Sequence, residues 1–314
     1  TKSFETSSIK NKLNNIIKLY NEIKKYYPHF NRDRLSKEKL FSIIYPDEKY
    51  NDSRMRALFS HTLALAENYL SLNETFSNNL AMRLNLIDAA KKKDDVSFYI
   101  SAIKRGNDSL KLHEHRDGEY YNSLFRIIQE ENNTISQFSN ARKIQQEADA
   151  LTVYYITNAL RTFATGFNRQ SSLAAELNTE LAKKVEELAE MPPFKNVPAV
   201  QIHYALYRIS RYHDENYFNS FMEMAGKQNV LKPSELYEAF HLLVNYCVLK
   251  ILKGEKKYVK TKLELYKFIL ERKLWESEGN LNYVIFNNIV SSALENNQPD
   301  FAESFINSYS CQLN

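Results

Sequence analysis

Hydrophobic residues recur every three or four positions along most of the chain, which is the spacing of one face of an α-helix. The segment from Tyr283 to Tyr309 shows this most clearly, because its first half places Ile285, Ile289 and Leu294 on one side. Its second half does the same with four further residues: Phe301, Phe305, Ile306 and Tyr309. A polar turn separates the halves, so the segment is predicted to form two antiparallel helices. Neither helix can bury its apolar stripe alone, and the pair therefore needs neighbours of the same kind.

The same pattern predicts helices throughout the chain. Before residue 190 the expected helices are Ser8–Tyr27, Lys37–Tyr45, a long helix capped by Asn51 or Asp52, Thr75–Lys92, one from Asp94 or Asp95 to Arg105, Glu119–Phe138, Ala141–Phe167 and one that starts at Ser171 or Ser172. Only six glycines and seven prolines occur, and nearly all of them fall where the apolar pattern stops or starts, as at helix ends. No run alternates as a β-strand does. The predicted fold class is all-α.

The helix that follows Ser172 is expected to be amphipathic. Its apolar stripe is predicted to be Leu173, Leu177, Leu181, Val185 and Leu188. Its charged residues of both signs are predicted to form a solvated face: Glu176, Glu180, Lys183, Lys184, Glu186 and Glu187. Charges that alternate in sign on an exposed helix are a poor basis for a catalytic pair of carboxylates.

The segment from Met191 to Pro198 is the clearest break in the chain. It holds three prolines, which exclude a continuous helix. A linker between domains and a tight corner within one stack would both fit, and the lack of a Gly/Ser composition favours the corner. We expect an array of helical hairpins over residues 1–190 that continues into three repeats over residues 197–314.

Three hairpins after this break align on the aromatic residue that begins each second helix. These residues are Phe218, Tyr258 and Phe301, and they stand 40 and 43 residues apart. Helical-hairpin repeats have periods of about 34–47 residues. The chain is therefore predicted to contain at least three copies of one degenerate repeat.

The hairpins resemble the tetratricopeptide-like superfamily of α-solenoids, many of whose divergent members are uncharacterised bacterial proteins. The features that carry the resemblance are the polar turn, the aromatic or small residue that follows it, and a Tyr or Phe that closes the second helix: Phe221, Tyr266 and Tyr309. The Trp-x-x-Leu-Gly-x-x-Tyr pattern of the 34-residue consensus is missing, and the sole tryptophan, Trp275, lies outside it. The resemblance implies a right-handed α-solenoid of antiparallel hairpins that binds a peptide or a protein on its concave surface.

Charge, cysteine content and hydropathy exclude several classes of protein. The net charge of +4 on 42 basic and 38 acidic residues is too balanced to indicate a nucleic-acid partner. Cys247 and Cys311 form neither a disulfide framework nor a metal motif, although a single bridge between them is left open, and Cys247 is expected to be buried on an apolar face. No apolar run is long enough to span a membrane and no signal peptide is present, so a cytoplasmic location is the default expectation. Because the chain starts at Thr1, a removed targeting segment is left open.

Catalytic and metal-binding motifs are not recognisable. His113 and His115 are two positions apart, where helical side chains point to different sides, and no local motif supplies a third ligand. The chain has no glycine-rich phosphate loop and no Gly-x-Ser-x-Gly motif. We therefore expect no metal, no cofactor and no enzymatic activity. An active site formed by residues that are remote in sequence is left open.

Two groups of polar residues are candidates for binding. Asn245 and Asn288 occupy equivalent positions in first helices, with Asn287 beside them, where amides could bind a peptide backbone. The densest basic cluster is Lys250, Lys253, Lys256, Lys257, Lys260, Lys262 and Lys267. The simpler interpretation of the asparagines is that they reflect the high asparagine content of the chain. The simpler interpretation of the lysines is a solvated turn. We predict a non-enzymatic scaffold for a protein or peptide partner; the alternatives are a nucleic-acid-binding solenoid that uses the lysines, and an enzyme.

The last predicted helix is a further candidate interface. Phe301, Phe305, Ile306 and Tyr309 run almost to the final residue without a polar capping helix after them. We expect this face to be covered by further chain, by a partner or by a second copy of the protein.

Overall fold

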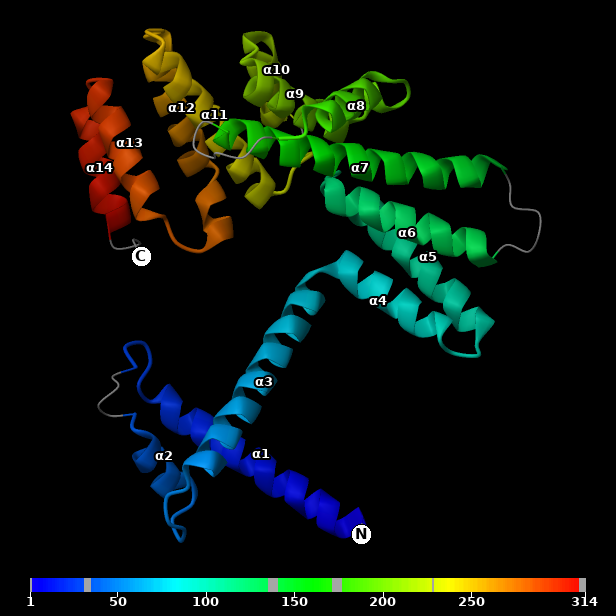
Figure 1. Cartoon of the computed structure of the whole chain (residues 1–314), viewed down its shortest axis with the longest axis vertical. Coiled ribbons are helices and arrows are strands. Elements are labelled where there is room, and N and C mark those ends of the chain that lie inside the picture. Colours follow the sequence, from blue (N-terminus) through cyan, green and yellow to red (C-terminus); the bar gives the residue numbers. More distant parts are fainter. Residues whose placement is uncertain (1, 31–34, 135–140, 171–176, 228, 311–314) are drawn as a thin grey trace. The chain divides into compact units, whose positions relative to one another are not determined.

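The computed structural model describes residues 2–30, 35–134, 141–170, 177–227 and 229–310. Within these residues it contains fourteen α-helices, two short 3₁₀ helices and no β-strand (Figure 1). The prediction of an all-α fold is confirmed. No described helix combines the length and the apolar character that crossing a membrane requires.

The chain divides into two compact units, residues 1–82 and 83–314. The first unit contains α1 (Lys2–Lys24), α2 (Lys37–Ile44) and α3 (Asp52–Ser77). The side chain of Asn51 caps α3 by accepting a hydrogen bond from the Arg54 N–H, as the sequence predicts. Leu19, Phe41 and Met55 come from the three helices and are buried together, so this unit has its own small hydrophobic core.

The second unit begins within α4 (Asn79–Lys91). It continues through α5 (Val96–Leu112), α6 (Gly118–Thr134), α7 (Ala141–Arg169), α8 (Thr179–Glu190), α9 (Pro198–Tyr212), α10 (Glu215–Lys227), α11 (Pro233–Leu252), α12 (Lys257–Glu271), α13 (Tyr283–Glu295) and α14 (Pro299–Tyr309). The 3₁₀ helices are η1 (Phe194–Asn196) and η2 (Leu274–Glu278). Most helices pack against their neighbours in sequence, and α9/α10, α11/α12 and α13/α14 are the three hairpins that the repeat spacing predicts.

One hydrophobic core runs from α7 to α14. Leu160 of α7, Tyr207 of α9, Phe240 of α11 and Phe305 of α14 all belong to it. The helix α7 packs on α9 and on α11, and α9 packs on α11, so the first helices of successive hairpins touch one another. The segment from Met191 to Pro198 lies inside this unit, where Phe194 is buried in the common core, as expected of a corner.

Several predicted helix limits are wrong, and close packing explains the largest error. The helix α5 does not end at Arg105 but continues to Leu112, so Gly106 lies in its middle. A Cβ atom at Gly106 would be 3.1 Å from the Cδ1 atoms of both Ile87 and Ile127, and glycine therefore allows α4 and α6 to approach α5.

Other limits shift by a few residues. The helix α1 ends at Lys24 rather than Tyr27. The helix α4 starts at Asn79 rather than near Thr75, since Asn78 accepts a hydrogen bond from the Ala81 N–H. The predicted helix start at Ser171 or Ser172 and the predicted end at Phe138 lie outside the described residues. Among the described residues here, the helix α8 begins at Thr179 and is capped by Asn178.

Candidate functional site

A cleft of about 540 Å³ opens between α8, η1, α9 and α10. This volume is within the ~300–1,000 Å³ of typical ligand pockets. Its floor and walls are apolar or aromatic: Ala189, Val200, Ala205, Met224, Tyr204 and Tyr217. Its polar lining residues are Glu190, Lys195, Gln201 and Ser220. The cleft therefore combines an apolar interior with a few polar groups of both charges.

The local sequence explains why the cleft forms between these helices. His213 ends α9 in the left-handed conformation with φ of 55°, and α10 starts at Glu215 after a turn of two residues. This tight turn brings Tyr217 of α10 to Tyr204 of α9, where the rings meet edge to face with centroids 5.5 Å apart. The two rings stand on neighbouring helices and form one aromatic wall.

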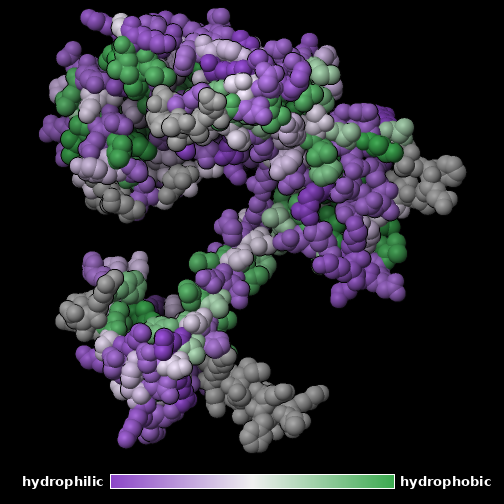
Figure 2. All heavy atoms as spheres, in the orientation of Figure 1, coloured by the Kyte–Doolittle hydropathy of each residue, from purple (hydrophilic) through white to green (hydrophobic). Residues whose placement is uncertain are grey.

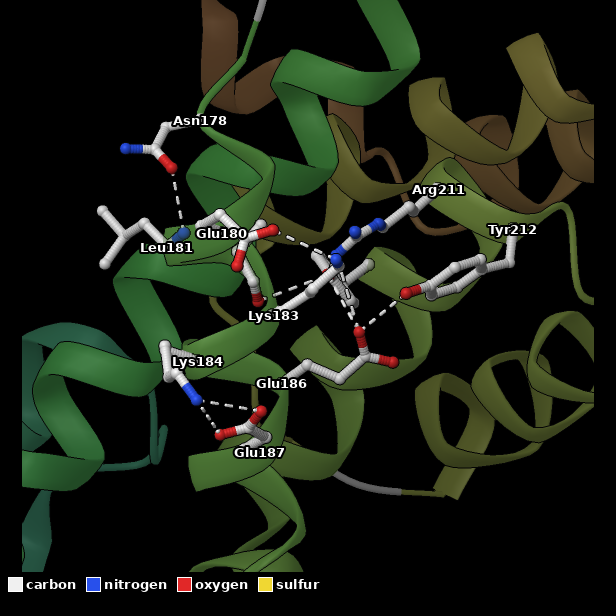
Figure 3. A network of polar contacts seen from close by, with 11 residues as sticks. Asn178, Glu180, Leu181, Lys183, Lys184, Glu186, Glu187, Arg211 and Tyr212 are labelled. Carbon is white, nitrogen blue, oxygen red and sulfur yellow. Dashed lines mark hydrogen bonds and ion pairs between the residues drawn. The ribbon is translucent and has the colours of Figure 1, made fainter.

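A polar network joins α8 to α9 beside the cleft, and Glu186 is its centre. The Glu186 carboxylate accepts hydrogen bonds from the Tyr212 hydroxyl at 2.8 Å, from Arg208 Nη1 at 3.0 Å and from the Tyr207 hydroxyl at 3.1 Å. Arg211 lies 3.5 Å from the same carboxylate. We call these five residues the Glu186 network. Figure 3 shows Glu186 turned toward Arg211 and Tyr212, while the neighbouring Glu187 is turned away toward Lys184.

The two arginines of the network also lie against aromatic rings. The Arg208 guanidinium is 5.0 Å from the ring centroid of Tyr217 in the cleft wall and 4.7 Å from that of Tyr212. Arg211 is 5.2 Å from the ring of Phe167 on α7. Guanidinium groups stack favourably on aromatic faces, and the network therefore fixes the cleft wall to α7 and α8.

Burial and hydrogen bonding keep Tyr204, one of the two tyrosines of the cleft wall, protonated. The pKa of Tyr204 is raised well above its usual value, first by burial and then by the hydrogen bond that its hydroxyl donates to Glu190. Burial likewise raises the pKa of Tyr207. At neutral pH the Tyr204 hydroxyl is therefore a hydrogen-bond donor, not a nucleophile or a base.

Comparison with protein-family models, with curated proteins and with solved structures finds no match for the chain. Its function is therefore inferred from the geometry of the described residues alone.

The asparagines predicted to bind a peptide backbone lie at different contacts between helices. Asn245 of α11 donates a hydrogen bond to the Asn168 side chain of α7 at 2.7 Å, and Asn168 donates to the Leu242 carbonyl. Asn288 of α13 is hydrogen-bonded to Tyr266 of α12, and Asn287 is exposed beside it. Asn245 and Asn288 thus both make contacts between helices of the chain itself.

The predicted lysine cluster is interleaved with carboxylates. Four of its lysines form ion pairs: Lys250 with Glu255, Lys257 with Glu215, Lys262 with Glu295 and Lys267 with Glu264. The other three, Lys253, Lys256 and Lys260, are exposed. The positive charge around α12 is therefore divided by negative charge instead of forming a continuous stripe.

The predicted C-terminal interface lies mostly inside the protein. The ring centroid of Phe305 is 5.0 Å from those of Phe286 and Tyr309. Tyr309 also packs on Trp275, and Phe301 is partly buried under Lys267. Among these four candidates only Ile306 is classed as exposed, and it offers 39% of its surface to solvent.

Two further predictions concern metal and thiol chemistry. The ring centroids of His113 and His115 are 6.3 Å apart, and the described residues contain no group of three or more His, Cys, Asp or Glu residues that could hold a metal ion. Cys247 is fully buried as predicted, and burial raises the pKa of its thiol to about 12. Cys311 lies outside the described residues.

Sequence reasoning placed Glu186 on a solvated face, and this was wrong. The buried side of α8 is formed by Ala182, Val185 and Ala189, whereas Leu181 is exposed. The prediction followed the larger leucines, although the alanines are what lets α9 come close. The sequence signal that could have found this arrangement is the row of small apolar residues, one at each turn of the helix. A helix buried on that row places Glu186 toward α9.

Proposed function

We propose that the protein is a non-enzymatic helical-repeat scaffold that binds a peptide segment of a protein partner in the cleft between α8 and α10. The observation that carries this proposal is the cleft itself. Its aromatic wall of Tyr204 and Tyr217 offers a large, rigid contact surface, and Glu190, Lys195, Gln201 and Ser220 stand beside it. Binding sites for peptides commonly combine such aromatic anchors with a few polar groups.

The architecture proposed for α7–α14 is a right-handed, tetratricopeptide-like solenoid. Two observations support it. The helices form a succession of antiparallel hairpins, and the first helices α7, α9 and α11 touch one another as they do in stacked repeats. In such a stack, a cleft between adjacent hairpins can bind a partner.

The proposed occupant is a short peptide with at least one apolar side chain. The apolar floor, formed in part by Val200, Ala205 and Met224, suits that side chain. Gln201 and Ser220 can both donate and accept hydrogen bonds, which suits the N–H and C=O groups of a peptide backbone. Because Tyr217 is held by Arg208, the wall is ordered before the peptide arrives, and binding loses little side-chain entropy.

The alternatives receive less support from the described residues. A nucleic-acid surface needs clustered positive charge, and the ion pairs around α12 reduce it. An enzyme that used the cleft would need a group tuned for proton transfer there, and the raised pKa of Tyr204 makes its phenol a poorer acid and removes it as a base at neutral pH.

A pair of neighbouring substitutions on α10 tests the proposal. Peptides would be selected from a displayed random library on the full chain, and their affinity measured by fluorescence polarisation. Ser220 lines the cleft, whereas the adjacent Asn219 is also exposed and does not line it. We expect Ser220→Trp to weaken binding by at least about tenfold, or roughly 1.4 kcal/mol, because the indole fills the cleft. Asn219→Trp should bind as the wild type does.

Two results would refute the proposal. The first is that no peptide is enriched on the wild-type chain. The second is that Ser220→Trp, with an unchanged circular dichroism spectrum, binds the selected peptides as tightly as Asn219→Trp.

A further inference from the structure

The second half of α3 carries large apolar side chains that leave the core of the first unit. Met55 and Leu58, in its first half, are buried against α1 and α2. Further along the helix, Leu65, Tyr69, Leu72 and Phe76 are between 46% and 68% exposed. Apolar side chains are visible on the surface along this helix in Figure 2. We call these last four residues the α3 seam.

The spacing of the seam is that of a coiled coil. Met55, Leu58, Thr62 and the four seam residues follow one another at alternating intervals of three and four positions. This is the pattern of the core positions of a heptad repeat, in which each helix packs against a second one. The stripe is continuous, but only its first two residues find partners within the core of the first unit.

The charges of α3 indicate what that second helix is. From Thr62 to Ser77 the only acidic or basic residues are Glu67 and Glu74, and His61 lies just before this stretch. At 100° per residue, both stand on the side of the helix opposite the seam. The positions that flank the seam carry no charge: Ala66, Asn68, Asn73 and Thr75. Two identical seams can therefore meet without placing like charges together.

Other classes of partner fit less well. An amphipathic helix that binds a membrane surface usually carries lysine or arginine on its polar face, where α3 has Glu67 and Glu74. A partner recognised by charge would need charged residues beside the seam. We infer that the α3 seam binds the α3 seam of a second copy of the chain, which makes the protein a dimer.

The size of the seam indicates a reversible dimer. Four side chains that bury roughly 100 Å² each, on both copies and with their flanking atoms, give a total interface on the order of 1,000 Å². This is the lower end for specific interfaces, where weak and transient complexes are found, and we therefore expect a dissociation constant of roughly 1–100 μM. The helix is already anchored by Met55 and Leu58, so pairing does not have to nucleate it.

The dimer does not depend on the peptide-binding proposal. If both hold, each dimer presents two clefts, and a partner with two binding segments would gain avidity without any new contact.

The same helix provides a matched control for the test. Leu63 and Leu70 are 60% and 65% exposed, but they lie outside the seam, beside the two glutamates. Sedimentation of the full chain would be measured from about 1 to 200 μM, a range that spans the micromolar affinity expected for such an interface. We expect the wild type and the double variant Leu63→Asp, Leu70→Asp to shift from monomer to dimer across it. The double variant Leu65→Asp, Leu72→Asp should remain a monomer, with thermal unfolding of the fold unchanged.

A wild-type chain that stays monomeric throughout this range would overturn the inference, whatever the variants do. So would a dimer that persists in Leu65→Asp, Leu72→Asp, or one that both double variants abolish equally.

Discussion

Replacing Phe305 with alanine probes the C-terminal hairpin most directly. Phe305 is 3% exposed, and its ring packs against Phe286 of α13 and against Tyr309 of its own helix. Truncating a buried phenylalanine to alanine destabilises proteins by about 3–5 kcal/mol, because the transfer free energy is lost and a cavity remains. The two ring contacts are within the range of aromatic pairs that contribute about 0.5–1.5 kcal/mol each. We expect Phe305→Ala to lower the opening free energy of this hairpin by roughly 4 kcal/mol.

The adjacent Ile306 supplies the control, since it is 39% exposed and lies about 100° around α14 from Phe305. Ile306→Ala should cost under about 1 kcal/mol, as usual for partly exposed positions. Native-state hydrogen exchange of the α14 amides measures both changes locally, even when the rest of the second unit stays folded. If Phe305→Ala costs no more than Ile306→Ala, Phe305 is not part of the core and the proposed packing of this hairpin is wrong.

Two further predictions concern polar groups. Glu186→Ala should lower the free energy of unfolding by about 2–4 kcal/mol, because it removes the carboxylate that accepts from Arg208 and from the Tyr212 hydroxyl. The Tyr207 hydroxyl keeps the Ala182 carbonyl as an acceptor, and Arg208 keeps its longer pair with Asp214. Glu187→Ala breaks only an exposed pair with Lys184 and should cost under about 0.5 kcal/mol in urea unfolding. Equal costs for these neighbours would contradict the network. Burial raises the pKa of Glu235 to about 7, with Asp117 adding to the rise and Arg161 opposing it, so the protonated form is favoured by folding. Stability from this group is present below its unfolded pKa near 4.5 and is lost as the pH rises through 7, by up to roughly 3 kcal/mol. Urea unfolding at several pH values should therefore show that Glu235→Gln loses less stability than the wild type as the pH rises. Glu238→Gln changes a half-exposed position and should lose as much stability as the wild type. Identical stability profiles for all three proteins would refute this explanation.

The helix content and the three hairpins α9/α10, α11/α12 and α13/α14 could be predicted from the sequence because they depend on local patterns. The polar turns after α9, α11 and α13 and the aromatic residues Phe218, Tyr258 and Phe301 recur at nearly constant spacing, and the hairpins are where they indicate. The predicted helix end near Gly106 was wrong because a glycine that ends a helix and a glycine that lets two helices approach look alike in one sequence.

The candidate site was not predictable in the same way. Its residues come from α8, η1, α9 and α10, and their meeting depends on which side of α8 is buried. That choice is made by Ala182 and Ala189 through close approach, a property of the helix pair and not of either helix. The lysines and asparagines singled out from sequence were visible because they cluster along the chain, yet Lys257, Lys262 and Asn245 are already used in contacts between helices.

Hydrogen exchange of the full chain, with and without a saturating selected peptide, tests the central claim most directly. We predict that the peptide slows exchange in the C-terminal half of α8, in the first half of α9 and in α10, which together line the cleft. Protection confined to other helices, or no protection at saturation, would contradict the assignment of the cleft as the binding site.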